Sequence, residues 1–185
     1  GNGLNCFDGN TFRAYYIRHS TVNSNRVLAL AELDAQTLVV GTNSGICLYD
    51  KHKDGLEPLQ LATEYGVSIS CEVPRIAKDK KGNIWIATLG QGLFIWNPTT
   101  GKLTQNSSYS SFIVDLSILD NTVYVATLQD GWVALRLDGT CKYKQSVVTE
   151  SGAMATLSTL VVTQGTVGVG TVNGDIFSFQ ASDGK

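Results

Sequence analysis

Short apolar runs recur along the whole chain, and turn-forming residues separate them. Runs rich in β-branched and aromatic residues, such as 27–31, 37–40 and 46–49, alternate with stretches that contain Gly, Asn and Asp. This pattern is typical of β-strands joined by tight turns. Many runs are apolar at consecutive positions, which indicates strands that are buried on both faces. The pattern therefore predicts an all-β fold.

Two short anchors repeat along the sequence with nearly constant spacing. The first is a small residue followed by Thr and, a few positions later, by Gly. Its threonines recur at steps of 46, 39 and 44 residues, at Thr42, Thr88, Thr127 and Thr171. The second is a turn that ends in Gly, at steps of 46, 46, 38 and 45 residues, at Gly9, Gly55, Gly101, Gly139 and Gly184. A period in the low forties is the length of one blade of a β-propeller.

Each repeat contains three apolar runs and then a more polar fourth run, such as 141–145. The sequence therefore predicts a β-propeller segment of four-stranded antiparallel blades, about four and a half blades long and part of a larger propeller. Residues 1–185 form a single segment. Its repeats are expected at approximately 1–25 (a partial blade), 26–70, 71–110, 111–152 and 153–185 (a partial blade).

Both ends of the sequence correspond to the third strand of a blade. Residues 3–8 match 45–50, and the last run, 176–179, is again a third strand. An uncovered blade face exposes about 400 Å² of apolar surface, at a cost on the order of 10 kcal/mol. We therefore expect the partner of these ends to be the rest of a larger propeller or a second copy of the chain.

Composition limits the other partners. Hydrophobic residues make up 43% of the chain and charged residues 16%, and the formal net charge is −2. This balance does not predict a nucleic-acid partner. No apolar stretch approaches the length of a membrane-spanning helix, and no charged and apolar leader opens the sequence, so we expect neither membrane insertion nor a signal peptide within this segment.

The residue types that hold metals or perform catalysis form no recognisable motif. The cysteines are widely spaced and include no C-x-x-C pair: Cys6, Cys47, Cys71 and Cys141. We expect small buried or half-buried strand residues here, with one disulfide left open, and no metal or cofactor. His19 and His52 fall at different places in the repeat, and no G-x-S-x-G or phosphate-binding loop is present. We therefore expect no catalytic residues.

One stretch carries a family resemblance. Residues 76–94 read I-A-K-D-K-K-G-N-I-W-I-A-T-L-G-Q-G-L-F. This resembles the two-component regulator propeller repeat, I-x-x-D-x-x-G-x-(I/L)-W-(I/V)-(G/A)-T-x-x-x-G-L. Later repeats depart from it, because Tyr124 and Gly168 stand where the repeat has Trp, and Trp132 stands where it has Leu. The resemblance implies an extracytoplasmic (periplasmic) sensor domain of a bacterial hybrid histidine kinase, with an oligosaccharide or another small molecule as its ligand.

Propeller topology indicates where such a ligand would bind. The turn between the second and third strands of each blade and the link between blades reach the same face. Polar groups that converge over a partly apolar floor are typical of small-molecule sites. Trp132 follows a Gly at a turn, where stacking on a sugar ring is the alternative to core packing. The candidate residues in the turns are Asn43, Gln91, Gln129, Asp130, Trp132 and Asn173, and the links add Arg26 and Arg75. The alternative is that all eight are solvated loop residues.

Three functional hypotheses remain open. The leading one is a non-catalytic, ligand-sensing propeller segment of an extracytoplasmic two-component sensor. The second is a protein-interaction scaffold, which the open apolar blade ends favour. The third is a lyase or hydrolase propeller, for which the sequence offers no residue constellation.

Overall fold

The computed structural model describes residues 3–16, 26–53 and 55–185, and these residues form antiparallel sheets without a helix. The first sheet has two strands, β1 (Leu4–Phe7) and β2 (Phe12–Tyr15). Three four-stranded sheets follow, and the last sheet has three strands. The four-stranded sheets contain β3 (Val27–Glu32), β4 (Thr37–Thr42), β5 (Gly45–Asp50) and β6 (Gly55–Pro58); β7 (Glu72–Lys78), β8 (Ile84–Leu89), β9 (Leu93–Trp96) and β10 (Leu103–Asn106); and β11 (Ile113–Leu119), β12 (Thr122–Thr127), β13 (Trp132–Arg136) and β14 (Cys141–Gln145). The last sheet contains β15 (Leu157–Thr163), β16 (Thr166–Thr171) and β17 (Ile176–Gln180).

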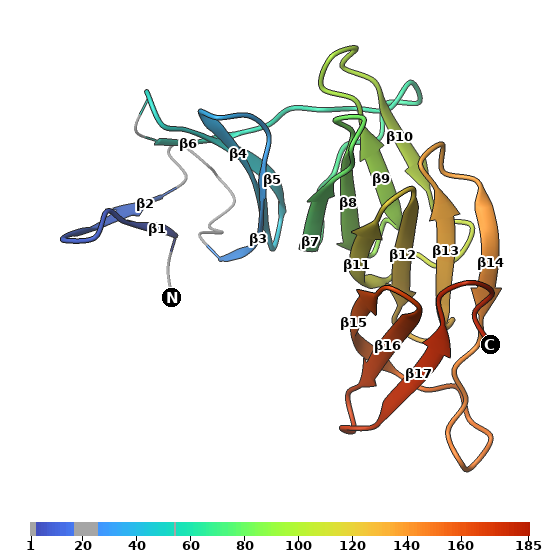
Figure 1. The fold of residues 1–185 in the computed structure, drawn as a ribbon. Helices are drawn as coiled ribbons and strands as arrows, with labels where there is room; N and C mark the ends of the chain where they lie inside the picture. The colour runs from blue at the N-terminus through green and yellow to red at the C-terminus, as the bar shows by residue number, and fades with distance from the viewer. Residues whose placement is uncertain (1–2, 17–25, 54) are drawn as a thin grey trace.

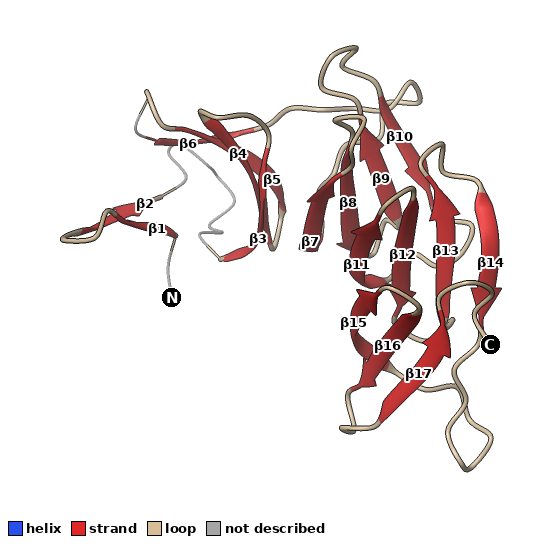
Figure 2. Ribbon diagram, viewed as in Figure 1, coloured by secondary structure: helices blue, strands red, loops and turns tan. Residues whose placement is uncertain are grey.

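The sheets follow one another in chain order as the blades of an open arc (Figures 1 and 2). Within each complete blade the strands pair in sequence order, so that β3, β7 and β11 form one edge and β6, β10 and β14 the other. The first strands also contact one another from blade to blade, β3 with β7, β7 with β11, and β11 with β15. This is the radial arrangement of a propeller, and it confirms the predicted fold class.

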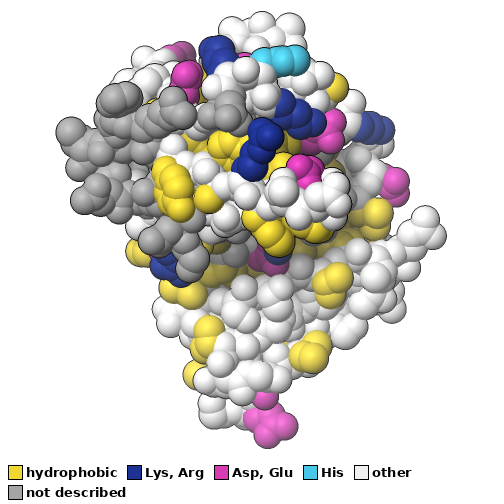
Figure 3. All heavy atoms as spheres, turned by 90° about the vertical axis from the view of Figure 1, so that its left-hand side faces the viewer, with side chains coloured by type: hydrophobic (Ala, Val, Ile, Leu, Met, Phe, Trp, Pro, Cys, Tyr) yellow, Lys and Arg dark blue, Asp and Glu magenta, His cyan; other side chains and the backbone are white. Residues whose placement is uncertain are grey.

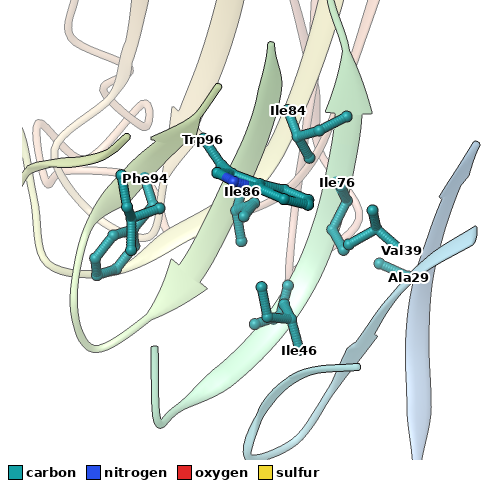
Figure 4. Close-up of a cluster of buried hydrophobic side chains, with 10 residues drawn as sticks. Ala29, Val39, Ile46, Ile76, Ile84, Ile86, Phe94 and Trp96 are labelled. Carbon is teal, nitrogen blue, oxygen red and sulfur yellow. The ribbon is translucent and has the colours of Figure 1, made fainter. Parts of the chain in front are cut away.

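The hydrophobic core lies between the blades. Figure 4 shows one such layer, in which Val39 and Ile46 of the β3–β6 blade face Ile76, Ile84 and Trp96 of the β7–β10 blade. Similar clusters join the β7–β10 and β11–β14 blades, and the β11–β14 and β15–β17 sheets. Because each four-stranded blade is covered on both faces, its inner strands are apolar at consecutive positions. Burial of each large side chain contributes roughly 1.5–3 kcal/mol.

The first strand of each blade contains a β-bulge close to its start. The register shifts between Val27 and Ala29, Glu72 and Arg75, Ile113 and Asp115, and Leu157 and Thr159. The residue after each shift lies opposite the small residue of the repeat anchor, which is Gly41, Ala87, Ala126 or Gly170. A small residue is required at Gly41, where an added Cβ would lie 2.8 Å from Cγ1 of Val73 in the next blade.

The Asp and Trp of the repeat motif form one hydrogen-bonded turn. Asp79 is buried, and its Oδ1 accepts hydrogen bonds from the backbone N–H groups of Lys81 and Asn83. Its Oδ2 accepts hydrogen bonds from the indole Nε1 of Trp85 at 2.9 Å and the Nδ2 of Asn83. Gly82 occupies the left-handed region, with φ 87°, which a turn of this shape requires. The motif thus fixes the hairpin between β7 and β8 and holds Trp85 in the core.

The cysteines and other ligand-type side chains remain separate in the described residues. All four cysteines are free; Cys47 is buried and Cys71 half-buried, whereas Cys6 and Cys141 are exposed, unlike the buried positions expected for them. Within these residues, three or more His, Cys, Asp or Glu side chains do not gather where they could hold a metal ion. None of the described residues belongs to a helix long and apolar enough to cross a membrane. His52 is exposed, and His19 lies outside the described residues.

Candidate functional site

The repeat threonine closes the turn between the second and third strands of each blade. The Oγ1 of Thr42 donates to the carbonyl of Gly45 at 2.9 Å, and the Oγ1 of Thr127 donates to the carbonyl of Gly131 at 2.7 Å. The same hydroxyl of Thr127 accepts a hydrogen bond from the N–H of Asp130 at 2.9 Å. Gly131 has φ 73°, and a Cβ there would collide with the carbonyl of Gln145. These contacts fix the turn through neighbouring residues and do not depend on packing between blades.

The turns lie beside the links between blades, as expected from the topology. The N–H of Gly45 donates to the carbonyl of Cys71 at 2.9 Å, and the N–H of Leu128 donates to that of Phe112 at 2.9 Å. The carbonyl of Leu128 in turn accepts the N–H of Leu157 at 2.8 Å. Turns and links therefore form one continuous face of the arc, and we refer to it as the link face.

A cavity of about 460 Å³ opens on the link face at the turn between β12 and β13. Its wall combines the link before β11, the strands β13 and β14, and the link after β14. The lining residues are Ser108, Tyr109, Thr127, Asp130, Trp132, Val133, Lys144, Gln145, Ser146 and Met154. A volume of this size is in the range of small-molecule sites. Hydroxyl, amide, carboxylate and ammonium groups line it beside two aliphatic side chains, so the cavity can bind polar ligands.

Asp130 and Lys144 are the charged side chains among the lining residues of this cavity, and both are exposed. Tyr109 is half-buried beside them, and burial, followed by the neighbouring thiol of Cys141, raises the pKa of its phenol. The phenol is therefore a neutral hydrogen-bonding group near pH 7. Asp130 is the single carboxylate of the lining, whereas glycosidic cleavage uses a pair.

Trp132 reaches the cavity wall from the core. It begins β13, is buried, and has its ring within 6.2 Å of Tyr124, 5.8 Å of Tyr143 and 5.5 Å of Phe179, measured between ring centroids. Trp132 therefore packs in the core, which was the alternative to stacking on a sugar ring. Its indole Nε1 is buried and has no hydrogen-bond partner among the described residues.

Gln91 ties its turn to the preceding link. Its Oε1 accepts the N–H of Ser70 at 2.9 Å, and its Nε2 donates to the carbonyl of Ser68 at 2.9 Å. Both ends of the side-chain amide are thus engaged with backbone. At the corresponding turn of the next blade, Gln129 makes one long contact, 3.4 Å, to the Oγ1 of Thr156.

The remaining candidate residues lie apart from the cavity. Asn173 lines a second hollow of about 510 Å³ on the link face, with Glu150 and Asp175. Asn43 is exposed in the turn between β4 and β5, and Arg26 is exposed immediately before β3. Of the eight candidates, the structure brings Asp130 and Trp132 together at one cavity.

Arg75 lies inside β7, not in a link. Its Nε donates to Oδ1 of Asp115 at 2.7 Å, and Asp115 is buried whereas the Arg75 side chain is half exposed. Because Asp115 follows the bulge of β11 as Arg75 follows that of β7, the ion pair joins equivalent positions of neighbouring blades.

Sequence reasoning missed the side chains that β14 and the links contribute to the cavity. Lys144 pairs with Val133, and Gln145 pairs with Trp132. Counting outward from the turn at Gly139 would have placed both residues near the start of β13, but one position out of register, because the ladder shifts between Ala134 and Leu135. Tyr109 and Met154 come from irregular links, for which the sequence pattern gives no register.

Comparison with known proteins finds a propeller family that matches part of this chain. Residues 68–90 match the family described as "Two component regulator propeller". Those residues therefore resemble one repeat of that family. The repeat covers the link before β7, β7 itself and β8 up to the next turn, which includes the hydrogen-bonded pair Asp79 and Trp85. No curated protein sequence matches the chain.

Solved structures share the fold of this propeller repeat segment. The extracellular domain of BT3049, assigned to a hybrid two-component system of B. thetaiotaomicron, matches with a TM-score of 0.74 at 22% identity, over 100% of this chain and 27% of that one. The extracellular domain of BT4673 from the same organism matches with a TM-score of 0.78 at 22% identity, over 100% of this chain and 24% of that one. The computationally designed Ika4 protein matches with a TM-score of 0.63 at 17% identity, over 89% of this chain and 96% of that one. The chain spans about a quarter of the length of the two extracellular domains.

Proposed function

We propose that this chain is a non-catalytic, ligand-sensing propeller segment of an extracytoplasmic two-component sensor. The observation that carries the proposal is the polar cavity on the link face of a chain that contains a two-component regulator propeller repeat. The likeness to extracellular domains of such systems supports the same location and role. Kinase activity would belong to another part of such a sensor.

The chemistry of the cavity favours a neutral, polyhydroxylated ligand such as an oligosaccharide. Asp130 offers a carboxylate that accepts hydrogen bonds from hydroxyl groups, and Lys144 offers an ammonium group that donates them. The amide group of Gln145 both donates and accepts hydrogen bonds. Ser108 and Ser146 add hydroxyl groups, which also do both. Met154, which is 44% exposed, gives an aliphatic surface against which the C–H face of a sugar ring can pack. Because the charges of Asp130 and Lys144 are opposite, the cavity has no net charge that would favour an ionic ligand.

The proposal is tested by measuring the thermal unfolding of the chain against a panel of neutral oligosaccharides. A ligand at a hundred times its Kd stabilises the folded chain by roughly 2.7 kcal/mol, which is a measurable rise in Tm. We expect Asp130→Asn and Lys144→Met each to weaken binding of the best oligosaccharide about tenfold, the worth of one charge-assisted hydrogen bond.

The matched control is Lys102→Met, which removes the charge of an exposed lysine in the turn between β9 and β10. It should leave the affinity unchanged. Equal affinities of wild type and both cavity variants would contradict the proposed site, and a panel without any effect on Tm would contradict the ligand class.

A protein-interaction scaffold is a second proposal, favoured by one observation. Val161, Val172 and Ile176 are exposed around the last sheet, although each is a large aliphatic residue. Apolar groups gathered on a surface are typical of contacts between proteins.

A further inference from the structure

A hollow of about 460 Å³ opens on the face of the arc that lies opposite the link face. It is formed between two neighbouring blades, by the turn between β7 and β8, the turn between β11 and β12, and the turn between β13 and β14. Because the strands are antiparallel, these turns lie at the strand ends farthest from the links (Figure 1). We refer to this feature as the basic hollow, and its lining residues are Lys81, Asn121, Arg136, Leu137, Asp138 and Lys142.

The basic hollow gathers positive charge in a chain that is negative overall. Three of its lining side chains are cations and one is a carboxylate, whereas the formal net charge of the chain is −2. Most of the charged side chains visible in Figure 3 also lie in the upper half of that view, on the side of these turns, and the lower half is largely uncharged. In the part of the chain that the structure describes, Arg75 and Lys185 form ion pairs, but the cations of the hollow do not. Like charges that gather without a counter-charge repel one another, so an anion between them is favoured.

The guanidinium of Arg136 is held in place by its own turn. Its Nη1 donates to the carbonyl of Cys141 at 2.8 Å and to Oγ1 of Thr140 at 3.3 Å. Both hydrogens of Nη1 are therefore used, whereas Nε and Nη2 have no hydrogen-bond partner among the described residues. The edge formed by Nε and Nη2 can bind two oxygens of one anion at once. Arg136 is thus positioned with a donor edge still available.

Lys142 places a second cation beside this arginine. It lies at the bulge of β14, and its Nζ donates to Oγ1 of Thr122 at 2.9 Å. Thr122 pairs with Arg136, and cross-strand partners point to the same face of a sheet. The ammonium group therefore lies over the strand end that carries Arg136, with two of its hydrogens left for a ligand. Lys81 comes from the neighbouring blade, on the turn that Asp79 closes through the backbone N–H of Lys81.

The carboxylate of the hollow is engaged by its own turn. Oδ1 of Asp138 accepts hydrogen bonds from Oγ1 of Thr140 at 2.6 Å and from the N–H of Thr140 at 2.9 Å. These hydrogen bonds, together with the charge of Arg136, hold the pKa of Asp138 below its ordinary value. Asp138 is therefore ionised near pH 7, and it offsets only part of the positive charge.

We propose that the basic hollow binds a phosphate or sulfate group, either as the free ion or as the ester of a small organic molecule. The Nε and Nη2 edge of Arg136 binds two oxygens of the group, and the ammonium groups of Lys142 and Lys81 bind the others. Asn121 and Leu137 line the space that an attached organic group would occupy. The site lies on the face opposite the cavity at Asp130, so the proposal does not depend on the sensing function.

An NMR titration of the isotope-labelled chain tests the proposal, with inorganic phosphate, inorganic sulfate and glycerol 3-phosphate as probes and glycerol as the uncharged reference. We expect the amide signals of Asn121 and Leu137 to shift with the three anions until they saturate, and to stay unchanged with glycerol. Added potassium chloride should weaken binding, because salt screens exposed charges. Tighter binding of glycerol 3-phosphate than of inorganic phosphate would support an ester as the ligand, and the reverse order would support the free ion.

Variants of the lining residues separate the site from a general response to charge. Arg136→Gln and Lys142→Met should each weaken phosphate binding about tenfold, the worth of one charge-assisted hydrogen bond. Arg136→Lys keeps the charge but loses the forked edge, so it should also weaken binding. Asp138→Asn should strengthen binding, because it removes the negative charge, and a misfolded variant would not produce such a gain.

The matched control is Lys102→Met, which removes the same charge from an exposed lysine outside the hollow. It should leave the phosphate affinity unchanged. Equal losses for Lys102→Met and Lys142→Met would overturn the proposal, because the chain would then respond only to its net charge. Amide shifts at Asn121 and Leu137 that are absent, or that never saturate, would overturn it as well.

Discussion

The guanidinium of Arg75 reaches across a blade boundary to the carboxylate of Asp115, with Nε 2.7 Å from Oδ1. The other oxygen of Asp115 accepts hydrogen bonds from the N–H of Leu160 at 2.8 Å and from Oγ1 of Thr159 at 3.1 Å. One buried carboxylate therefore links the first strands of three consecutive blades, β7, β11 and β15. It does so at the bulges, where the regular ladder leaves polar groups unpaired.

Asp115→Ala should destabilise the chain more than Arg75→Met does. The first substitution leaves the N–H of Leu160 buried without a partner, at a cost of about 2–4 kcal/mol. The second removes a half-exposed guanidinium and leaves the other donors of Asp115 in place, at a cost of about 1 kcal/mol. Urea unfolding of the two variants measures the difference. A larger effect of Arg75→Met would mean that the ion pair, not the backbone contact, holds the blades together.

Asp79→Asn should be destabilising although it preserves size and shape. The carboxylate accepts hydrogen bonds on both oxygens, so an amide group in either orientation turns an N–H toward a donor, either backbone or Trp85. We expect a loss of about 2–3 kcal/mol in the free energy of unfolding. A double-mutant cycle with Trp85→Phe isolates the indole contact, with an expected coupling of about 1–2 kcal/mol. Additive effects of the two substitutions would contradict this account.

Gln91→Ala should loosen the link before β7. The variant loses two hydrogen bonds to the backbone of Ser68 and Ser70, for about 1 kcal/mol of stability, and the amide of Ser70 should exchange faster with solvent. Gln129→Ala is the control, because its single contact is long and exposed, and it should cost less than about 0.5 kcal/mol. Equal costs for the two glutamines would show that the Gln91 clamp contributes nothing.

Cys47 should make stability depend on pH in the alkaline range. Burial raises the pKa of its thiol to about 11, above its ordinary value of 9.0. Between pH 9 and 11 the unfolded chain has released this proton whereas the folded chain retains it, so rising pH favours unfolding. The contribution is complete below pH 9 and is lost as the pH rises through about 11. Urea unfolding of wild type and Cys47→Ala across this range should show a shallower pH dependence for the variant, and parallel curves would refute the assignment.

The fold could be predicted because its signals are local. The glycines and the Thr anchor act within a few residues, as the contact from Thr127 to Gly131 shows, so their spacing reveals the blade period directly. Burial of both blade faces then makes the apolar runs continuous. The contact of Arg75 with Asp115 could not be predicted in the same way, because it joins residues 40 positions apart and depends on the bulge register.

The candidate site was predicted less completely than the fold. The turn at Asp130 was placed on the link face from topology alone, and the cavity lies there. Trp132 shows the limit of that reasoning, because the glycine before it indicates a turn, whereas its pairing with Ala126 directs the ring toward the next blade. Tyr109 and Met154 lie in links without a regular pattern, and only the packed structure brings them beside Asp130.

The threonine contacts have a consequence for how the turns of this propeller can vary. Thr42 and Thr127 are the last residues of their strands, and each closes its turn by a side-chain hydrogen bond to the glycine carbonyl. The glycine lies three residues after Thr42 but four residues after Thr127. The residues between Thr and Gly can therefore differ in number and type while the ends of the two strands stay joined, although a residue such as Gln91 also holds the neighbouring link. Under the proposed sensing function, the turns at the rim can diversify while the frame that supports them stays the same.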